Sequence, residues 1–158
     1  MKKKLYLLII PFILIVDLLS KFFVNKYIVL DTSKVIIDNF FYLTYTHNFG
    51  AAFSMFNGKT IFILIVSICM FLYLVYELIK NINKYNISIP LSFIIGGLLG
   101  NLYDRLFLGY VRDFLDFHIF GFNAAIFNIG DTFIVIGVIL LALSIIKEER
   151  ANGKVKSN

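Results

Sequence analysis

The chain has 158 residues and a mass of 18.2 kDa; 59% of the residues are hydrophobic, only 16% are charged, and the mean hydropathy is +0.85. Soluble domains usually carry about 25% charged residues, so a water-soluble globule and a disordered chain are both excluded. The formal charge of +5 does not indicate nucleic-acid binding, because the basic residues flank apolar segments instead of forming a stripe. The composition therefore predicts a membrane protein that contacts lipid and does not bind nucleic acid.

Four apolar stretches are each long enough to cross a bilayer, which requires roughly 20 residues in a helix. They are residues 5–23, 60–79, 89–107 and 126–146. None alternates with a period of two, so we expect an all-α membrane protein, a bundle of four transmembrane helices forming a single membrane domain over residues 1–158. Pro11 is expected to kink the first helix, whereas Pro90 suits the start of the third.

Lysine and arginine residues outside the spans predict the orientation of the bundle. With the N-terminus inside, nine lie on the inner side and four on the outer side. The inner ones are Lys2, Lys3, Lys4, Lys80, Lys84, Lys147, Arg150, Lys154 and Lys156, and the outer ones are Lys26, Lys34, Lys59 and Arg112. We therefore expect both termini in the cytoplasm. Because Asp17 interrupts the first span and no small-residue cleavage site follows it, this span is expected to be a retained anchor.

Two outer segments, 24–59 and 108–125, connect the spans. The first contains an aromatic and β-branched stretch, 40–46, which predicts short strands and hence a small extracytoplasmic β-cradle. His47 beside it is interpreted as a loop histidine, because no partner has metal-ligand spacing to it. Cys69 is the single cysteine, so no intrachain disulfide is predicted. The sequence has no zinc-type Cys/His cluster, and neither a metal site nor a cofactor is expected.

The ionisable side chains of the spans gather toward the predicted outer end. An ionisable group near the bilayer centre costs roughly 2.5–3.5 kcal/mol, so each is a functional candidate. The set comprises Asp17, Lys21, Asp104, Arg105 and Asp131, with Asp113 and Asp116 in the adjoining outer segment. An ion pathway needs polar groups through the whole depth of the membrane. The gathering therefore predicts a site at the outer interface.

Several of these groups also have a purely structural interpretation. Asp17 and Lys21 are four residues apart, and such a pair often only fixes a helix end. Asp104 with Arg105 can serve as an interfacial anchor of the third helix. Asp116 can be a solvated loop residue.

The start of the fourth span and the glycines of the third have structural interpretations as well. Asn128 and Asp131 resemble a helix N-cap followed by an acidic residue at the third helical position. Gly96 and Gly100 form a small-xxx-small pair, which is typical of helix packing in membranes.

Two carboxylates held close together provide a metal-free way to hydrolyse a peptide bond. One deprotonates a water molecule while the other stays protonated and polarises the carbonyl, and like charges at short range share one proton. Asp113, in an outer segment, and Asp131, at the facing helix start, are placed to converge in this way. A proton-coupled carrier or channel subunit and a non-catalytic assembly subunit remain alternatives. A carrier commonly has repeated halves, which this sequence lacks, and an assembly subunit leaves the grouped carboxylates unexplained.

Five short blocks stand in order along the chain: Asp17 with Lys21, then 48–53 (NFGAAF), 100–105 (GNLYDR), 111–116 (VRDFLD) and 127–131 (FNIGD). Together they resemble the lipoprotein signal peptidases, the type II signal peptidases of bacteria, which are four-span membrane aspartic peptidases. The resemblance covers essentially the whole chain.

The resemblance implies a function and a set of site residues. Asp113 and Asp131 are implied to form the catalytic dyad. Residues implied to line the site or support the dyad are Asn48, Gly50, Asn101, Arg105, Asn128, Asp17 and Lys21. The implied substrate is a diacylglyceryl-modified prolipoprotein, cut just before its lipid-bearing cysteine at the outer face of the bacterial plasma membrane. A monomer without cofactor or metal is expected.

Three departures from the family pattern bear on rate or pH optimum. Gly130 stands where the family usually has Ala, and it is expected to loosen the helix start. Arg112 replaces an apolar residue, and its charge is expected to lower the pKa of Asp113. The segment before Phe127 lacks a proline that is often found there.

Overall fold

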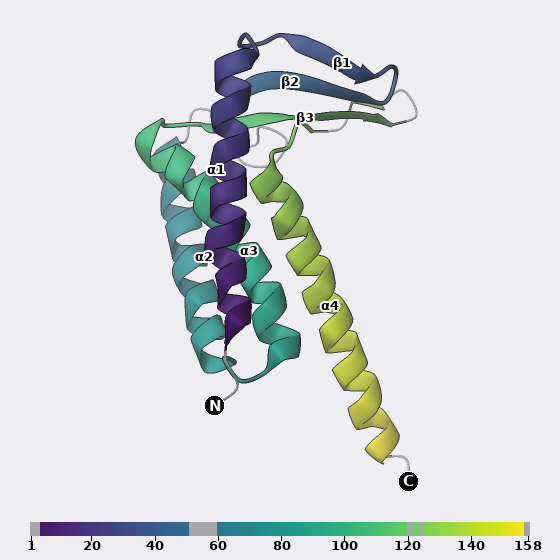
Figure 1. Ribbon diagram of the computed structural model, residues 1–158. Helices are drawn as coiled ribbons and strands as arrows, with labels where there is room; N and C mark the ends of the chain where they lie inside the picture. Colours follow the sequence, from purple (N-terminus) through teal and green to yellow (C-terminus); the bar gives the residue numbers. More distant parts are fainter. Residues whose placement is uncertain (1–3, 51–59, 120–121, 124, 157–158) are drawn as a thin grey trace.

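The computed structural model describes residues 4–50, 60–119, 122–123 and 125–156. A short 3-10 helix, η1 (Leu5–Leu8), leads into α1 (Ile9–Tyr27), which is followed by α2 (Thr60–Lys80), α3 (Tyr85–Phe107) and α4 (Ile129–Lys156). The helices form one bundle, and a small sheet lies across one end of it (Figure 1). Helix α1 begins, and α4 ends, at the opposite end.

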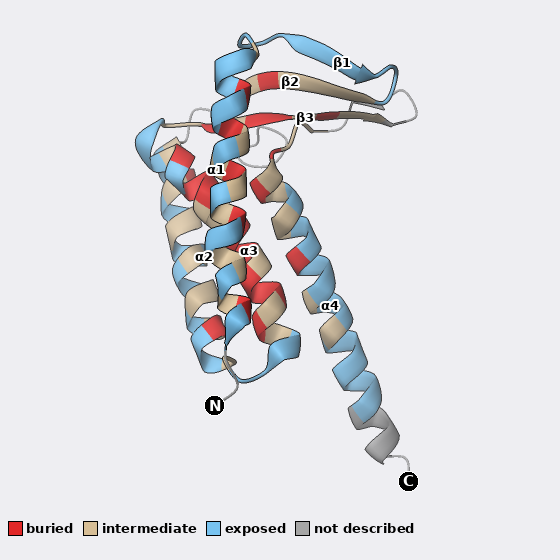
Figure 2. Cartoon of the chain, in the orientation of Figure 1, coloured by how far each residue is buried: buried red, intermediate tan, exposed pale blue. Residues whose placement is uncertain are grey.

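Within the described part of the chain, four helices are long and apolar enough to cross a membrane. They are Leu5–Tyr27, Thr60–Lys80, Tyr85–Phe107 and Ile129–Ala151. The third is the least apolar and the most buried, because α1, α2 and α4 all pack against α3. Many large hydrophobic residues of the helices are exposed, as expected for surfaces that contact lipid. Figure 2 shows exposed positions along the outer faces of the helices. The expected four-span helical membrane fold is confirmed.

The observed starts of α3 and α4 differ from the expected starts of the third and fourth spans. Helix α3 begins at Tyr85, so Pro90 is its sixth residue and does not mark its start. Pro11 lies in the first turn of α1, directly after η1, where its missing N–H is least disruptive. Helix α4 begins only at Ile129, because Phe127 exchanges backbone hydrogen bonds with Leu115 and is held extended.

The sheet is antiparallel and follows the order β1 (Ser33–Ile37), β2 (Phe41–Asn48), β3 (Val111–Ile119) and β4 (Phe122–Asn123). The predicted strand at 40–46 is confirmed as β2. Strand β3 occupies a segment for which no strand was predicted. Its register pairs Thr46 with Asp113 and Tyr42 with Asp116. Asp116 is buried and accepts a 2.6 Å hydrogen bond from Thr44 Oγ1, so its interpretation as a solvated loop residue was wrong.

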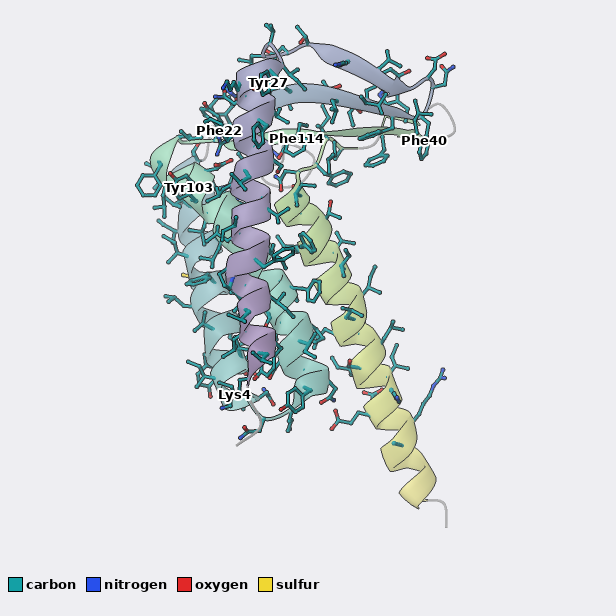
Figure 3. The ribbon with its side chains drawn as sticks, in the orientation of Figure 1. Lys4, Phe22, Tyr27, Phe40, Tyr103 and Phe114 are labelled. Atoms are coloured by element: carbon teal, nitrogen blue, oxygen red, sulfur yellow. The ribbon has the colours of Figure 1, made fainter. Side chains whose placement is uncertain are left out.

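Two apolar clusters hold the ends of the bundle together. Near the end away from the sheet, the cluster comprises Tyr6, Leu78, Leu91 and Ile95. Under the sheet, Val24, Tyr45 and Phe114 join α1 to β2 and β3, and Phe114 is seen beside α1 in Figure 3. Gly96 faces α1, where a Cβ atom would lie 2.9 Å from Ile13 Cβ, so the interpretation of Gly96 as a packing glycine is confirmed.

Candidate active site

A cavity of about 200 Å³ lies where the sheet meets the adjoining ends of α3 and α4. Its lining residues are Asn48, Asn101, Arg105, Val111, Asp113, Ala125, Ile126, Phe127, Asp131, Ile134 and Val135. Polar side chains come from β2, α3, β3 and the start of α4, whereas Ile134 and Val135 form an aliphatic wall on α4. The cavity therefore combines a polar site with a surface suited to hydrocarbon.

Asp113 presents its carboxyl group to this cavity from β3. Asn128 Nδ2 donates to its Oδ1 at 2.6 Å, and Asn48 Nδ2 donates to its Oδ2 at 2.8 Å. The side chain is almost fully buried. Both carboxyl oxygens are thus fixed by amide donors from two different elements.

Asp131 reaches the same cavity from the first turn of α4, where it belongs to a reciprocal cap. Asn128 Oδ1 accepts the Asp131 N–H at 2.9 Å, and the Asp131 carboxylate accepts the Asn128 N–H at 3.2 Å. This is a capping box with Asp in place of Glu, so the N-cap interpretation holds. Asn128 also bonds Asp113, as described above. One asparagine therefore contacts both carboxyl groups.

The second oxygen of Asp131 is held by α3. Asn101 Nδ2 donates to Asp131 Oδ1 at 2.7 Å, while Asn101 Oδ1 accepts a hydrogen bond from Lys21 Nζ at 2.8 Å. Because a lysine ammonium only donates, this bond fixes which end of the amide faces Asp131. Asp131 consequently accepts hydrogen bonds on both oxygens.

Electrostatics differ from the expectation for Asp113. Burial, and next the nearby charge of Asp131, raise the pKa of Asp113 to about 7, against the opposing hydrogen bonds from Asn48 and Asn128. The expectation that Arg112 lowers this pKa was wrong. The Arg112 guanidinium is turned to Asp104, with Nη2 2.6 Å from Oδ1 and Nε 3.2 Å from Oδ2.

Arg105 connects α3 to the turn that follows β2. Its guanidinium donates to the Gly50 carbonyl at 3.1 Å, and the Gly50 N–H donates to Asn48 Oδ1 at 2.9 Å. Its positive charge interacts with both Asp113 and Asp131. The remaining positions of that sequence block, 51–53, lie outside the described residues.

Asp17 and Lys21 lie directly behind the cavity and are completely buried. Lys21 Nζ is 2.7 Å from Asp17 Oδ2, and Asp17 Oδ1 accepts the Gly130 N–H at 2.7 Å. The start of α4 is therefore held and not loosened at Gly130. A Cβ atom there would lie 2.8 Å from the Gly97 carbonyl oxygen, so the absence of a side chain allows α3 and α4 to approach closely.

All nine predicted site residues lie at the sheet end of the bundle. Asn48, Asn101, Arg105, Asp113 and Asp131 line the cavity, Gly50 and Asn128 bond to these, and Asp17 and Lys21 support them from behind. Sequence reasoning named Asp104 as a candidate group and as a possible anchor but did not assign it to the site, yet it is completely buried and binds Arg112. That pairing depends on the chain reversal at Gly109, where φ is 82°, and no periodicity signals it.

His47 lies in β2 and not in a loop. Its ring stacks on Tyr110 with 3.7 Å between ring centroids, and its Nε2 is 3.0 Å from the Tyr45 hydroxyl. Burial lowers the pKa of His47, so the ring is neutral near pH 7. Among the residues that the structure describes, no group of three or more His, Cys, Asp or Glu side chains is arranged to hold a metal ion.

Comparisons with known proteins converge on one family. The sequence profile described as signal peptidase (SPase) II matches residues 9–147. A lipoprotein signal peptidase of Streptococcus agalactiae serotype Ia is 43% identical over 96% of this chain and 97% of its own length. One from Caldanaerobacter subterraneus subsp. tengcongensis is 40% identical over 85% and 91%, respectively.

Solved structures give the same result at the level of the fold. One described as a bacterial membrane enzyme at 2.3 Å resolution, determined by the in meso method, is 34% identical and superposes with a TM-score of 0.86, covering 94% of this chain and 91% of that one. A second, at 1.9 Å, is also 34% identical with a TM-score of 0.82, covering 92% and 95%.

Proposed function

The chain belongs to the signal peptidase II family, and from this premise we propose that it is a membrane aspartic peptidase that removes signal peptides from prolipoproteins. The observation that carries the proposal is that two carboxyl groups from different elements, β3 and α4, line one cavity and share a hydrogen-bonding partner, Asn128.

Asp113 and Asp131 are proposed as the dyad, with different protonation states. Asp131 is proposed as the base, because both of its oxygens accept hydrogen bonds from amide N–H groups, and such bonds favour a carboxylate. Asp113, with a pKa of about 7, holds the shared proton near neutral pH and acts as the acid. The two groups titrate as a coupled pair.

The reaction follows from these two states. Asp131 removes a proton from a water molecule whose oxygen attacks the scissile carbonyl, while Asp113 transfers its proton to the carbonyl oxygen. The resulting tetrahedral gem-diol then collapses. Its C–N bond breaks, the leaving nitrogen takes the proton held by Asp131, and one hydroxyl proton returns to Asp113. The products are a new carboxyl end on the signal peptide and a free amino group on the lipoprotein.

The cavity walls support the choice of substrate. Ile134 and Val135 line it on the α4 side, where a hydrocarbon chain can lie while the peptide contacts the polar residues. A diacylglyceryl group on the cysteine keeps that residue at the membrane surface beside the dyad. We therefore propose that the cut bond is the one directly before the modified cysteine.

The proposed orientation places the site outside the cytoplasm. The dyad lies at the sheet end, whereas η1 begins and α4 ends at the other end of the bundle (Figure 1). The excess of lysine and arginine in the N-terminal, 80–84 and C-terminal segments favours a cytoplasmic position for that other end. The enzyme is accordingly proposed to act at the outer face of the bacterial plasma membrane.

The test uses purified full-length protein in detergent with a diacylglyceryl-modified prolipoprotein. Wild-type protein is expected to give one product whose mass begins at the modified cysteine, and the same rate after treatment with a metal chelator. Asp113→Asn and Asp131→Asn should remain folded and lose about 10²–10⁴-fold in rate. A prolipoprotein with Ser in place of the cysteine serves as the control substrate and should not be cut. Normal cleavage by both Asn variants would end the dyad assignment.

A further inference from the structure

Two aspartates outside the dyad hold the backbone directly before each dyad residue. Asp17 Oδ1 accepts the N–H of Gly130, the residue before Asp131, at 2.7 Å. Asp104 Oδ2 accepts the N–H of Arg112, the residue before Asp113, at 3.1 Å. The same contact is thus made twice, by carboxylates from α1 and from α3, on the two segments that carry the dyad.

Lys21 lies between these two anchoring carboxylates. Its ammonium nitrogen is 2.7 Å from Asp17 Oδ2 and 3.5 Å from Asp104 Oδ2. All three side chains have 0% exposure, so water does not screen the two contacts. Together with Arg112, which binds Asp104, the group contains two negative and two positive charges.

We propose that Asp17, Lys21 and Asp104 form a positioning cluster that sets the separation of the two dyad carboxyl groups, with Lys21 as the tie between the two anchors. The inference rests on the proposed dyad and adds a task for residues that do not touch the reacting atoms. Each anchor fixes one segment, and Lys21 fixes one anchor relative to the other.

Two further contacts restrict movement of the cluster. Lys21 also donates to Asn101 Oδ1 at 2.8 Å, which directs the Asn101 amide nitrogen to Asp131. Gly100 leaves room for the Asp17 carboxylate, since a Cβ atom at that position would lie 2.0 Å from Asp17 Oδ2. Asp17, which anchors the start of α4, is therefore held both by packing against the backbone of α3 at Gly100 and by its ion pair with Lys21.

The position of Asp104 is set by charge as well as by hydrogen bonds. Arg112 reaches it with its backbone N–H and with two guanidinium nitrogens, so the side chain and the main chain of one residue bind the same carboxylate. This contact draws the strand toward α3 at the residue before Asp113. A change at Asp104 is therefore expected to move Asp113 without altering the groups that bind substrate.

The experiment measures kcat and KM per folded enzyme for Lys21→Met, Asp104→Asn and the double variant Lys21→Met/Asp104→Asn. Misplacing reacting groups by about 1 Å costs on the order of 10²-fold in rate. We expect each single variant to lose 10-fold or more in kcat with KM within about 2-fold of wild type. Ser92→Ala is the matched control, because Ser92 is equally buried on α3 and its hydroxyl donates to the Ser88 carbonyl of the same helix, away from the cluster. It should change thermal stability and leave kcat unaltered.

The double variant separates positioning from charge balance. The double variant removes one positive and one negative charge. If the cluster served only to balance charge, both stability and kcat should recover relative to the single variants. The positioning role predicts that stability recovers and kcat stays low. Recovery of kcat in the double variant would overturn the proposal.

Asp104→Asn supplies the result if the Lys21 variant is not recovered folded, because it keeps the size of the side chain but removes the ion pairs with Lys21 and Arg112 and places an NH2 donor against one of these donors. Wild-type kcat in this variant would also overturn the proposal. Asp113→Asn, measured in parallel, distinguishes failure of the positioning cluster from failure of the dyad assignment. An inactive Asp113→Asn beside a normal Asp104→Asn rejects the positioning cluster alone, whereas an active Asp113→Asn rejects the dyad first.

Discussion

Buried polar groups at the two ends of the bundle have partners at very different distances along the chain. Away from the sheet, Ser92 Oγ donates to the Ser88 carbonyl on its own helix, and Ser88 Oγ donates to the Asn81 carbonyl in the preceding loop. At the sheet end, Asp17 bonds Gly130, and Lys21 bonds Asn101. The first kind of contact maintains a helix and its connection. The second fixes one element against another.

This difference in partners explains why the buried polar residues at the sheet end include charged ones, whereas Ser88 and Ser92 at the other end are neutral. A neutral hydroxyl with a local acceptor is satisfied at little cost, whereas a buried charge is tolerated only with partners of opposite charge and further hydrogen bonds. Asp17 and Lys21 meet that condition through each other and through α3 and α4. Substitutions at the sheet end should therefore alter turnover, and substitutions at the other end should alter stability alone.

The largest effect that sharpens this comparison is expected at Asn128, which caps α4 and bonds Asp113. Asn128→Ala should lower kcat by about 10–100-fold, because a hydrogen bond to an ionisable group is lost, and should cost about 1 kcal/mol of stability through loss of the cap. Asn128→Ser keeps a capping oxygen and lacks the donor to Asp113. Its melting temperature should approach wild type while kcat stays low. Recovery of both quantities in the Ser variant would show that Asn128 acts only as a cap.

The next effect concerns pH. Asp113 has a pKa of about 7 in the folded protein against 3.8 as the ordinary value, so the folded chain holds a proton that the unfolded chain loses. Stability should therefore fall as pH rises from about 4 to about 7, by on the order of 4 kcal/mol, and level off above that range. If Asp113 acts as the acid, kcat/KM should be about tenfold lower at pH 8 than its limit below pH 7.

Thermal unfolding in detergent and initial rates across pH 5–9 check both statements. Asp113→Asn is the control for stability, since it removes the titrating group and should flatten the decline. A melting temperature that falls equally in wild type and variant would assign the decline to another group.

A smaller effect is expected at Arg105, which bonds the Gly50 carbonyl and lies within electrostatic reach of Asp113 and Asp131. Arg105→Gln should lower kcat/KM about fivefold, corresponding to roughly 1 kcal/mol for one hydrogen bond. Arg105→Lys retains the charge, so a smaller loss in that variant would identify the charge as the important part. Unchanged turnover in the Gln variant would show that Arg105 is only an anchor.

The smallest effect on activity is expected at the end away from the sheet. The Tyr6 hydroxyl donates to the Ile82 carbonyl, joining η1 to the loop between α2 and α3. Tyr6→Phe should lower stability by about 1 kcal/mol and leave kcat and KM unchanged. A fall in kcat comparable to that of Asn128→Ala would remove the distinction between the two ends.

Local patterns account for the features of this molecule that the sequence predicts well. The four spans follow from runs of apolar residues, the Asp17–Lys21 pair from its spacing of four, and the Asn128–Asp131 cap from its spacing of three. In each case the partners are close in sequence, so one periodicity or one motif is enough. The five blocks of family resemblance added the site residues that no local pattern assigns.

Features that depend on distant partners were missed. Strand β3 exists because Val111–Ile119 pairs with β2, more than 60 residues earlier, and its own sequence mixes charged and apolar residues. The direction of the Arg112 side chain depends on the turn at Gly109 and on the position of Asp104. The expected effect of Arg112 on Asp113 failed for this reason, since adjacent residues of a strand point to opposite faces.

The Asp17–Lys21 ion pair also bears on how the chain enters the membrane. Both residues lie on α1, one helical turn apart, so the pair can form before any other span is present. Charges that neutralise each other within one helix lower the penalty for transfer from the translocation machinery into lipid. Of the four spans, α1 is synthesised before the other three, so the buried ion pair can already be formed when α3 and α4 pack against it.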